Sequence, residues 1–124
     1  LTWAQAAQAP LCLLTPDMQN RRIIDGVFRS VGAAPKPSVE TNSIFNLVSH
    51  VSAGHWSAIV PRPLLLCVGI KANTRAIALT SPMARRSVGY VVADRDPTPP
   101  LVRNLLAMPL PPRIVALFAD EARP

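Results

Sequence analysis

The stretch from Glu40 to Pro61 limits the fold most narrowly, because it contains the start and stop signals of three successive elements. Ser43 can cap a helix whose apolar residues recur at helical spacing, and Gly54 can end that helix. A mostly apolar run from Trp56 then leads to Pro61. The sequence thus predicts a short strand over 38–41, a helix over 43–53 and a buried strand over 56–60.

The same alternation precedes this stretch. Residues 11–14 form an unbroken apolar run between Pro10 and Thr15, which is typical of a strand buried on both faces. Apolar residues at helical spacing predict a helix near 17–31 that ends at Gly32, and Thr2 with Gln5 predicts a capped helix over 3–8. On the 17–31 helix, the charged side chains are expected to face away from the core; they are Arg21, Arg22, Asp25 and Arg29.

This order of strand, helix, strand, helix and strand predicts an α/β fold with a parallel-rich sheet and right-handed crossovers. Beyond it, we expect a loop with one helical turn over 61–73 and further strands over 74–80 and 88–92. Thr98 and Pro99 favour the opening of a last helix over 101–108. The apolar face of the 43–53 helix should pack against the strands over 11–14 and 56–60; its residues are Ile44, Leu47, Val48 and Val51.

Composition indicates one small globular domain. The chain has 124 residues, of which 49% are hydrophobic, and its apolar runs are far shorter than the roughly 20 residues of a membrane helix. The absence of a signal-peptide pattern predicts a cytoplasmic location. The net charge of +6 comes from scattered basic residues, which favours a solvated basic surface over a nucleic-acid interface. Cys12 and Cys67 lie in apolar runs and are expected to be reduced core thiols.

Candidate binding residues follow from topology. In an open parallel sheet, ligands bind beyond the carboxyl ends of the strands, where helix N-termini also gather. The three predicted strand ends should therefore face one cleft. Two alternatives stay open: Ser43 can be only a helix cap, and Arg62 can be only a solvated arginine. The candidate residues are Thr15, Met18, Gln19, Thr41, Asn42, Ser43, Pro61 and Arg62.

The sequence contains no pattern for catalysis, a metal or a cofactor. His55 is expected to pack beside Trp56, and His50 to lie on the polar side of its helix. Neither histidine has a second histidine, a cysteine or a carboxylate at the required spacing. A glycine-rich phosphate loop and a nucleophile elbow are also missing. We therefore expect a protein that is not an enzyme.

The turn at 41–43, the short helix that follows, its close at Gly54 and the run Ser57–Pro61 together resemble the effector-binding domain of LysR-type transcriptional regulators. The resemblance extends from about residue 2 to 109. It implies a two-lobed fold of the type 2 periplasmic-binding-protein class. Residues 1–83 would form the second lobe, 84–109 the returning strand and helix of an incomplete first lobe, and 110–124 a C-terminal tail.

The resemblance also implies a function, namely sensing a small metabolite and controlling DNA binding. DNA would be bound only through an N-terminal helix-turn-helix that these residues do not contain, so we expect a truncated domain. Its partners would be a small-molecule effector, such as a carboxylate or another anion, and further copies in a homo-oligomer, because truncation would expose an apolar face. Gly54-His55-Trp56 is bulkier than the glycine-rich turn of many members. The alternatives on the same fold are a solute-binding protein of a transporter and, less favoured, an enzyme.

Overall fold

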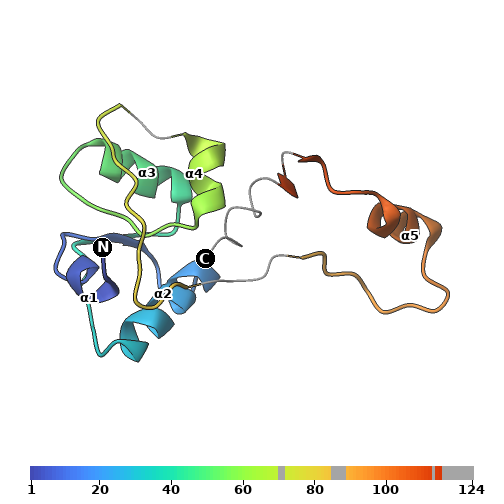
Figure 1. The fold of residues 1–124 in the computed structure, drawn as a ribbon, viewed down its shortest axis with the longest axis horizontal. Helices are drawn as coiled ribbons and strands as arrows, with labels where there is room; N and C mark the ends of the chain where they lie inside the picture. The colour runs from blue at the N-terminus through green and yellow to red at the C-terminus, as the bar shows by residue number, and fades with distance from the viewer. Residues whose placement is uncertain (70–71, 85–88, 113, 116–124) are drawn as a thin grey trace. The chain divides into compact units, whose positions relative to one another are not determined.

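The computed structural model describes residues 1–69, 72–84, 89–112 and 114–115, apart from the side chains of Leu66 and Cys67. The chain divides into two compact units, Leu1–Ala84 and Arg85–Pro124. Figure 1 shows the helices and strands. In chain order they are α1 (Trp3–Ala6), β1 (Cys12–Leu14), α2 (Gln19–Ser30), β2 (Val39–Thr41), α3 (Ile44–Ser52), α4 (Arg62–Val68) and α5 (Pro100–Ala107).

Strand β1 is the centre of the first unit. It pairs in parallel with β2, in a register that places Leu14 opposite Thr41. A parallel bridge joins Leu11 to Ser57, where the Cys12 N–H donates to the Ser57 carbonyl at 2.8 Å and the Ser57 N–H donates to the Pro10 carbonyl at 2.9 Å. The three chain segments therefore run in the same direction. This confirms the α/β class and the parallel pairing that the alternation of elements predicts.

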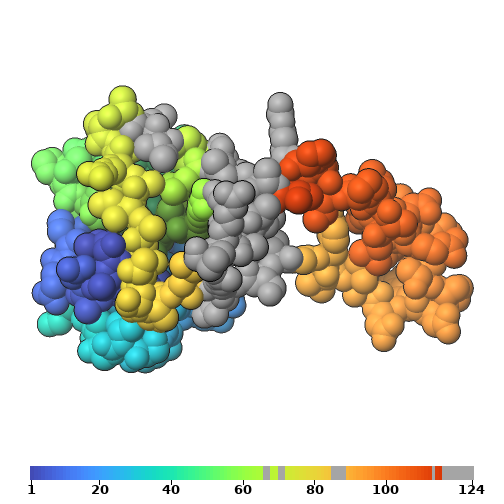
Figure 2. All heavy atoms as spheres, in the orientation of Figure 1, coloured from blue at the N-terminus to red at the C-terminus, as the bar shows by residue number. Residues whose placement is uncertain are grey.

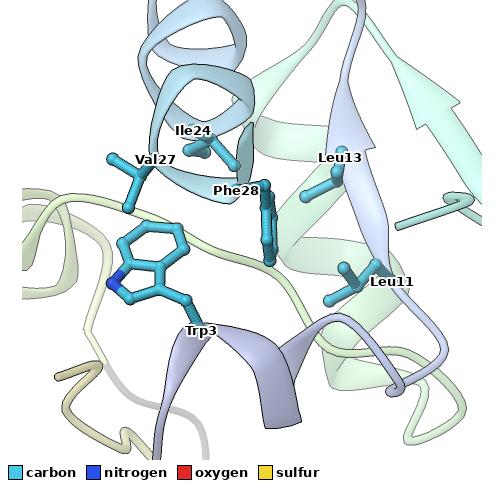
Figure 3. Close-up of a cluster of buried hydrophobic side chains, with 6 residues drawn as sticks. All are labelled: Trp3, Leu11, Leu13, Ile24, Val27 and Phe28. Atoms are coloured by element: carbon cyan, nitrogen blue, oxygen red, sulfur yellow. The ribbon is translucent and has the colours of Figure 1, made fainter. Parts of the chain in front are cut away.

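The two faces of β1 are covered by different helices. Leu11 and Leu13 pack with residues of α1 and α2, and Figure 3 shows these side chains together with Trp3 and Phe28. The rings of Trp3 and Phe28 meet edge to face with their centroids 5.2 Å apart. On the other face, Cys12 and Leu14 pack with Leu47 of α3. All four residues from Leu11 to Leu14 are at most 3% exposed. The prediction of a strand buried on both faces is confirmed. Figure 2 draws the heavy atoms that form the outer surface of this unit.

The helix ends follow local signals. Thr2 and Gln5 form the predicted capping box of α1. Gly32 and Gly54, which follow α2 and α3, have φ angles of 68° and 89°. These angles lie in the left-handed region that glycine adopts most readily, as expected at helix C-termini. Helix α4 is longer than the single turn predicted. Pro61 is its N-cap residue, and Pro63 lies in its first turn, where the missing N–H of a proline breaks no helical hydrogen bond.

Three expected strands are not strands in the described residues. Segment 56–60 makes the single bridge at Ser57, and 74–80 makes a single bridge between Thr80 and Thr2. Residues 89–92 form no ladder, and Val88 lies outside the described residues. The apolar pattern predicted their extended character, but a strand also needs a neighbour that exchanges hydrogen bonds over several residues.

The structure places fewer residues of α3 in the core than the sequence pattern predicts. Leu47 is 1% exposed, whereas Ile44 is 39% exposed and both Val48 and Val51 are half-buried. The physical reason is that the sheet under α3 consists of two three-residue strands, which cover only a narrow stripe of the helix. In the second unit, α5 begins and ends one residue earlier than predicted and has no buried residue.

Leu47→Ala is expected to lower the free energy of unfolding by roughly 2–5 kcal/mol, because it opens a cavity against Cys12 and Leu14. The matched control is Phe45→Ala on the same helix, since Phe45 is 81% exposed and its loss should change stability by less than about 0.5 kcal/mol. Urea unfolding followed by circular dichroism measures both. Equal effects of the two variants would contradict this assignment of the buried face.

Candidate functional site

The ends of β1 and β2 lie side by side. Leu14 and Thr41 are register partners, and the Thr15 N–H donates to the Thr41 carbonyl at 3.0 Å. The residues that follow each strand therefore leave the sheet at the same edge. The structure thus brings the first two groups of candidate residues together, because parallel strands end at a common edge.

The first group leads into α2. The Thr15 carbonyl accepts a hydrogen bond from the Met18 N–H at 3.0 Å, and Met18 occupies the N-cap position without a side-chain cap. Met18 is half-buried and packs against Cys12, Leu14 and Leu47, so part of this side chain belongs to the core. Gln19 is exposed at the first position of α2. Of these residues, Gln19 has the polar groups nearest to solvent.

The second group is the turn that opens α3. The Ser43 N–H donates to Thr41 Oγ1 at 3.2 Å, and Ser43 Oγ accepts from the Asn46 N–H at 3.4 Å. Ser43 thus caps α3, which is the structural role considered for it from the sequence. Asn42 between them is exposed, and the first backbone N–H groups of a helix lack partners within that helix. The turn therefore presents hydrogen-bond donors at the positive end of the α3 dipole.

The third group begins α4. Pro61 and Arg62 are exposed and follow segment 56–60, which runs parallel to β1. Parallel direction places this exit toward the same edge as Thr15 and Thr41. The hydrogen bond from the Thr15 N–H to the Thr41 carbonyl joins the first two groups to each other.

A buried arginine lies directly beneath these turns, and the sequence prediction for it was wrong. Arg21 is buried, not solvent-facing. Its Nη1 donates to the Leu14 carbonyl and to Glu40 Oε1, both at 2.6 Å, and its Nε donates to Asp25 Oδ1 at 2.9 Å. Burial by itself would lower the pKa of the guanidinium, but the hydrogen bonds and charges of Glu40 and Asp25 outweigh it and raise that pKa. Arg21 therefore stays positively charged, and its charge is paired with two carboxylates.

The spacing of residues along α2 could have predicted the burial of Arg21. Arg21 lies three residues before Ile24 and seven before Phe28, both of which are buried on the core face of α2. Residues at these spacings share one face of a helix. A charged residue on an apolar face needs a charged partner, and Asp25 one turn later and Glu40 in the predicted strand could have supplied it.

The turn between β1 and α2 carries a negative charge. The Thr15 hydroxyl first, and then the backbone N–H of Asp17, hold the pKa of the Asp17 carboxyl below its usual value. Thr15 Oγ1 is itself shielded from solvent and has no partner at full hydrogen-bonding geometry among the described residues. Arg22 Nη2 donates to the Asp17 carbonyl at 2.9 Å. Asp17 is therefore ionised at neutral pH beside the proposed binding turn.

Both histidines lie against the ring of Trp56, and Cys12 is a buried thiol. His55 contacts Trp56 edge-on with ring centroids 5.5 Å apart, as predicted. His50, expected on the polar side, also meets this ring, at 5.4 Å. Burial raises the pKa of the Cys12 thiol, which disfavours its reactive thiolate. Within the described part of the chain, no cluster of three potential metal ligands occurs.

The family model of the LysR substrate binding domain matches residues 1–109. This chain belongs to that family. No curated protein and no solved structure matches the chain. The family is regulatory, and membership implies a fold of the periplasmic-binding-protein type 2 class. The structure shows an α/β unit with a small parallel sheet. Among the described helices, none is long and apolar enough to cross a membrane.

Ser43→Ala is expected to lower the free energy of unfolding by about 0.5–2 kcal/mol, because α3 loses the acceptor for the Asn46 N–H. Ser43→Asp should restore most of the loss, since a carboxylate at this position accepts the same bond and faces the positive end of the helix dipole. Thermal unfolding measures both variants. An alanine variant as stable as the parent would show that the cap contributes nothing.

Proposed function

We propose that this chain is the effector-sensing domain of a LysR-type transcriptional regulator. The observation that carries the proposal is the family match over residues 1–109. The domain would bind a small metabolite and control the DNA-binding activity of a helix-turn-helix part outside these 124 residues. It would act in the cytoplasm and catalyse no reaction.

The proposed binding surface is the edge where the turns after β1 and β2 meet. The hydrogen bond from Thr15 to Thr41 supports it, because it holds the two turns together. Asn42 and the first N–H groups of α3 would supply donors, which favour a small carboxylate or another anion. Gln19 would add a polar group from the start of α2. Met18, Ser43, Pro61 and Arg62 complete the proposed surface, with Ser43 also acting as a cap and Arg62 adding charge.

Residues 1–83 would be the second lobe and 84–109 the returning strand and helix of the first, with 110–124 as a tail. The opposite wall of the pocket would then come from the remainder of the first lobe. A ligand that contacts both walls favours the arrangement in which they are close, and it shifts the population of lobe arrangements only by its difference in affinity between them. This difference is the signal that the DNA-binding part would receive.

The test uses the complete regulator in a promoter assay, with the carboxylate that elicits the wild-type response in a panel of mono- and dicarboxylic acids. Thr41→Ala combined with Asn42→Ala should abolish this response, because the turn loses its hydroxyl and amide groups. DNA binding without effector should be retained. The matched control is Thr98→Ala with Asn104→Ala, which removes the same two residue types from exposed positions of the second unit. An unaltered response in the Thr41 and Asn42 variant would show that this turn does not bind the effector and has a structural role only.

We also propose that the chain self-associates. The second unit has apolar side chains in solvent, including Val91 at 99%, Leu101 at 81% and Met108 at 66% exposure. Exposed apolar groups of this kind favour contact between copies. Sedimentation velocity at about ten micromolar and above should therefore show a species larger than one chain. A strictly monomeric species across this range would contradict self-association.

A further inference from the structure

The guanidinium of Arg21 joins three elements at one point. It reaches from α2 to the last carbonyl of β1, at Leu14, and to the side chain of Glu40 in β2, while Asp25 one turn further along α2 holds its Nε. Only 10% of the Arg21 side chain is exposed. Breaking such a group away from its partners is costly, because a charge would be left buried without compensation.

The contacts lie one residue from the proposed binding turns. Leu14 directly precedes Thr15, and Glu40 directly precedes Thr41. The hydrogen bond to the Leu14 carbonyl holds the peptide group between Leu14 and Thr15 itself, because that carbonyl belongs to it. The position of Arg21 thus fixes the two strand ends relative to each other and relative to the start of α2.

The Leu14 carbonyl needs this donor because the sheet does not provide one. If the segment after Ser57 went on pairing with β1 in the register of the Leu11–Ser57 bridge, the backbone N–H of residue 61 would donate to the Leu14 carbonyl. Residue 61 is a proline, which has no N–H. The described pairing with segment 56–60 ends at the Ser57 bridge, and Arg21 supplies the hydrogen bond to the Leu14 carbonyl.

Arg21 is unsuited to bind the effector itself. Its charge is balanced by two carboxylates, and its described hydrogen bonds are directed to groups of the protein. A lysine could not replace it, because a single ammonium lacks the planar, divergent donors that reach two carboxylates and a carbonyl at once.

We propose that Arg21 is a positioning residue for the effector-binding turns: it sets the geometry of Thr15 and Thr41 without touching the effector. This inference rests on the proposed function for its meaning in sensing. That Arg21 holds these two turns in place follows from the contacts alone.

The test is amide hydrogen exchange by nuclear magnetic resonance on the full 124-residue chain, comparing Arg21→Met and Arg21→Lys with the parent. Two reporters lie at the site, the Thr15 amide bonded to the Thr41 carbonyl and the Ser43 amide bonded to Thr41 Oγ1. The reference is the Ser57 amide, bonded to the Pro10 carbonyl at the opposite end of β1. Arg29→Met, which removes an exposed arginine from the same helix, is the matched control.

Both Arg21 variants should accelerate exchange at Thr15 and Ser43 by roughly tenfold relative to Ser57, because the carboxyl ends of the two strands open while the opposite end of β1 stays closed. Arg29→Met should leave all three rates unchanged. Equal acceleration at all three amides would show a general loss of stability and overturn the positioning role. Unchanged rates at Thr15 and Ser43 would overturn it as well.

Glu40→Gln covers the case in which Arg21 variants do not fold. The Glu40 side chain is 41% exposed, so an amide is accommodated there, and it keeps an acceptor oxygen while removing one charge. It should give the same selective acceleration with a smaller amplitude, and no acceleration would count against the proposal. The exchange experiment needs no effector. Its failure would remove Arg21 from the site, whereas an unaltered promoter response in the Thr41 and Asn42 variant would refute only the sensing role of the turn.

Discussion

Burial of β1 on both faces is the constraint on which the first unit depends. Four successive residues from Leu11 to Leu14 are almost inaccessible to solvent, and their side chains alternate between α2 and α3. A strand in this position must bond its backbone on both sides, because unpaired polar groups in the interior are costly. On one side β2 provides those partners, and on the other side Ser57 pairs with the start of β1 while the Arg21 side chain donates to the Leu14 carbonyl at its end. Strand β2 and helices α2 and α3 are placed by their contacts with this strand, and α1 is placed by its contact with α2.

The same constraint explains the chemistry at the strand ends. Where β1 leaves the core, one carbonyl has no ladder partner, and a buried cation from α2 takes its place. The cation in turn requires carboxylates, which Asp25 and Glu40 supply. The proposed binding turns at Thr15 and Thr41 therefore rest on an arginine that is paired with two carboxylates, and the exposed Asn42 would be left to meet a ligand.

Particular residues show how far prediction from sequence reached. The caps at Thr2, Ser43 and Gly54 were predicted, because capping acts within one helical turn. The proximity of Thr15 and Thr41 was predicted from parallel topology. The burial of Arg21 was missed, because its acceptor in Glu40 lies 19 residues away in the chain. The exposure of Ile44 was missed because the pattern does not state how wide the covering sheet is.

The sequence by itself determined the alternation of helices and strands up to α3, the caps at Thr2, Ser43 and Gly54, the two-faced burial of β1 and the family, since these depend on local spacing and on residue type. Only the tertiary structure decided which extended segments became strands, which residue of α3 entered the core and what held the two strand ends together. The physical reason is that hydrogen-bond ladders, burial and ion pairs need partners from distant parts of the chain. Their formation depends on the assembled geometry and not on any one segment.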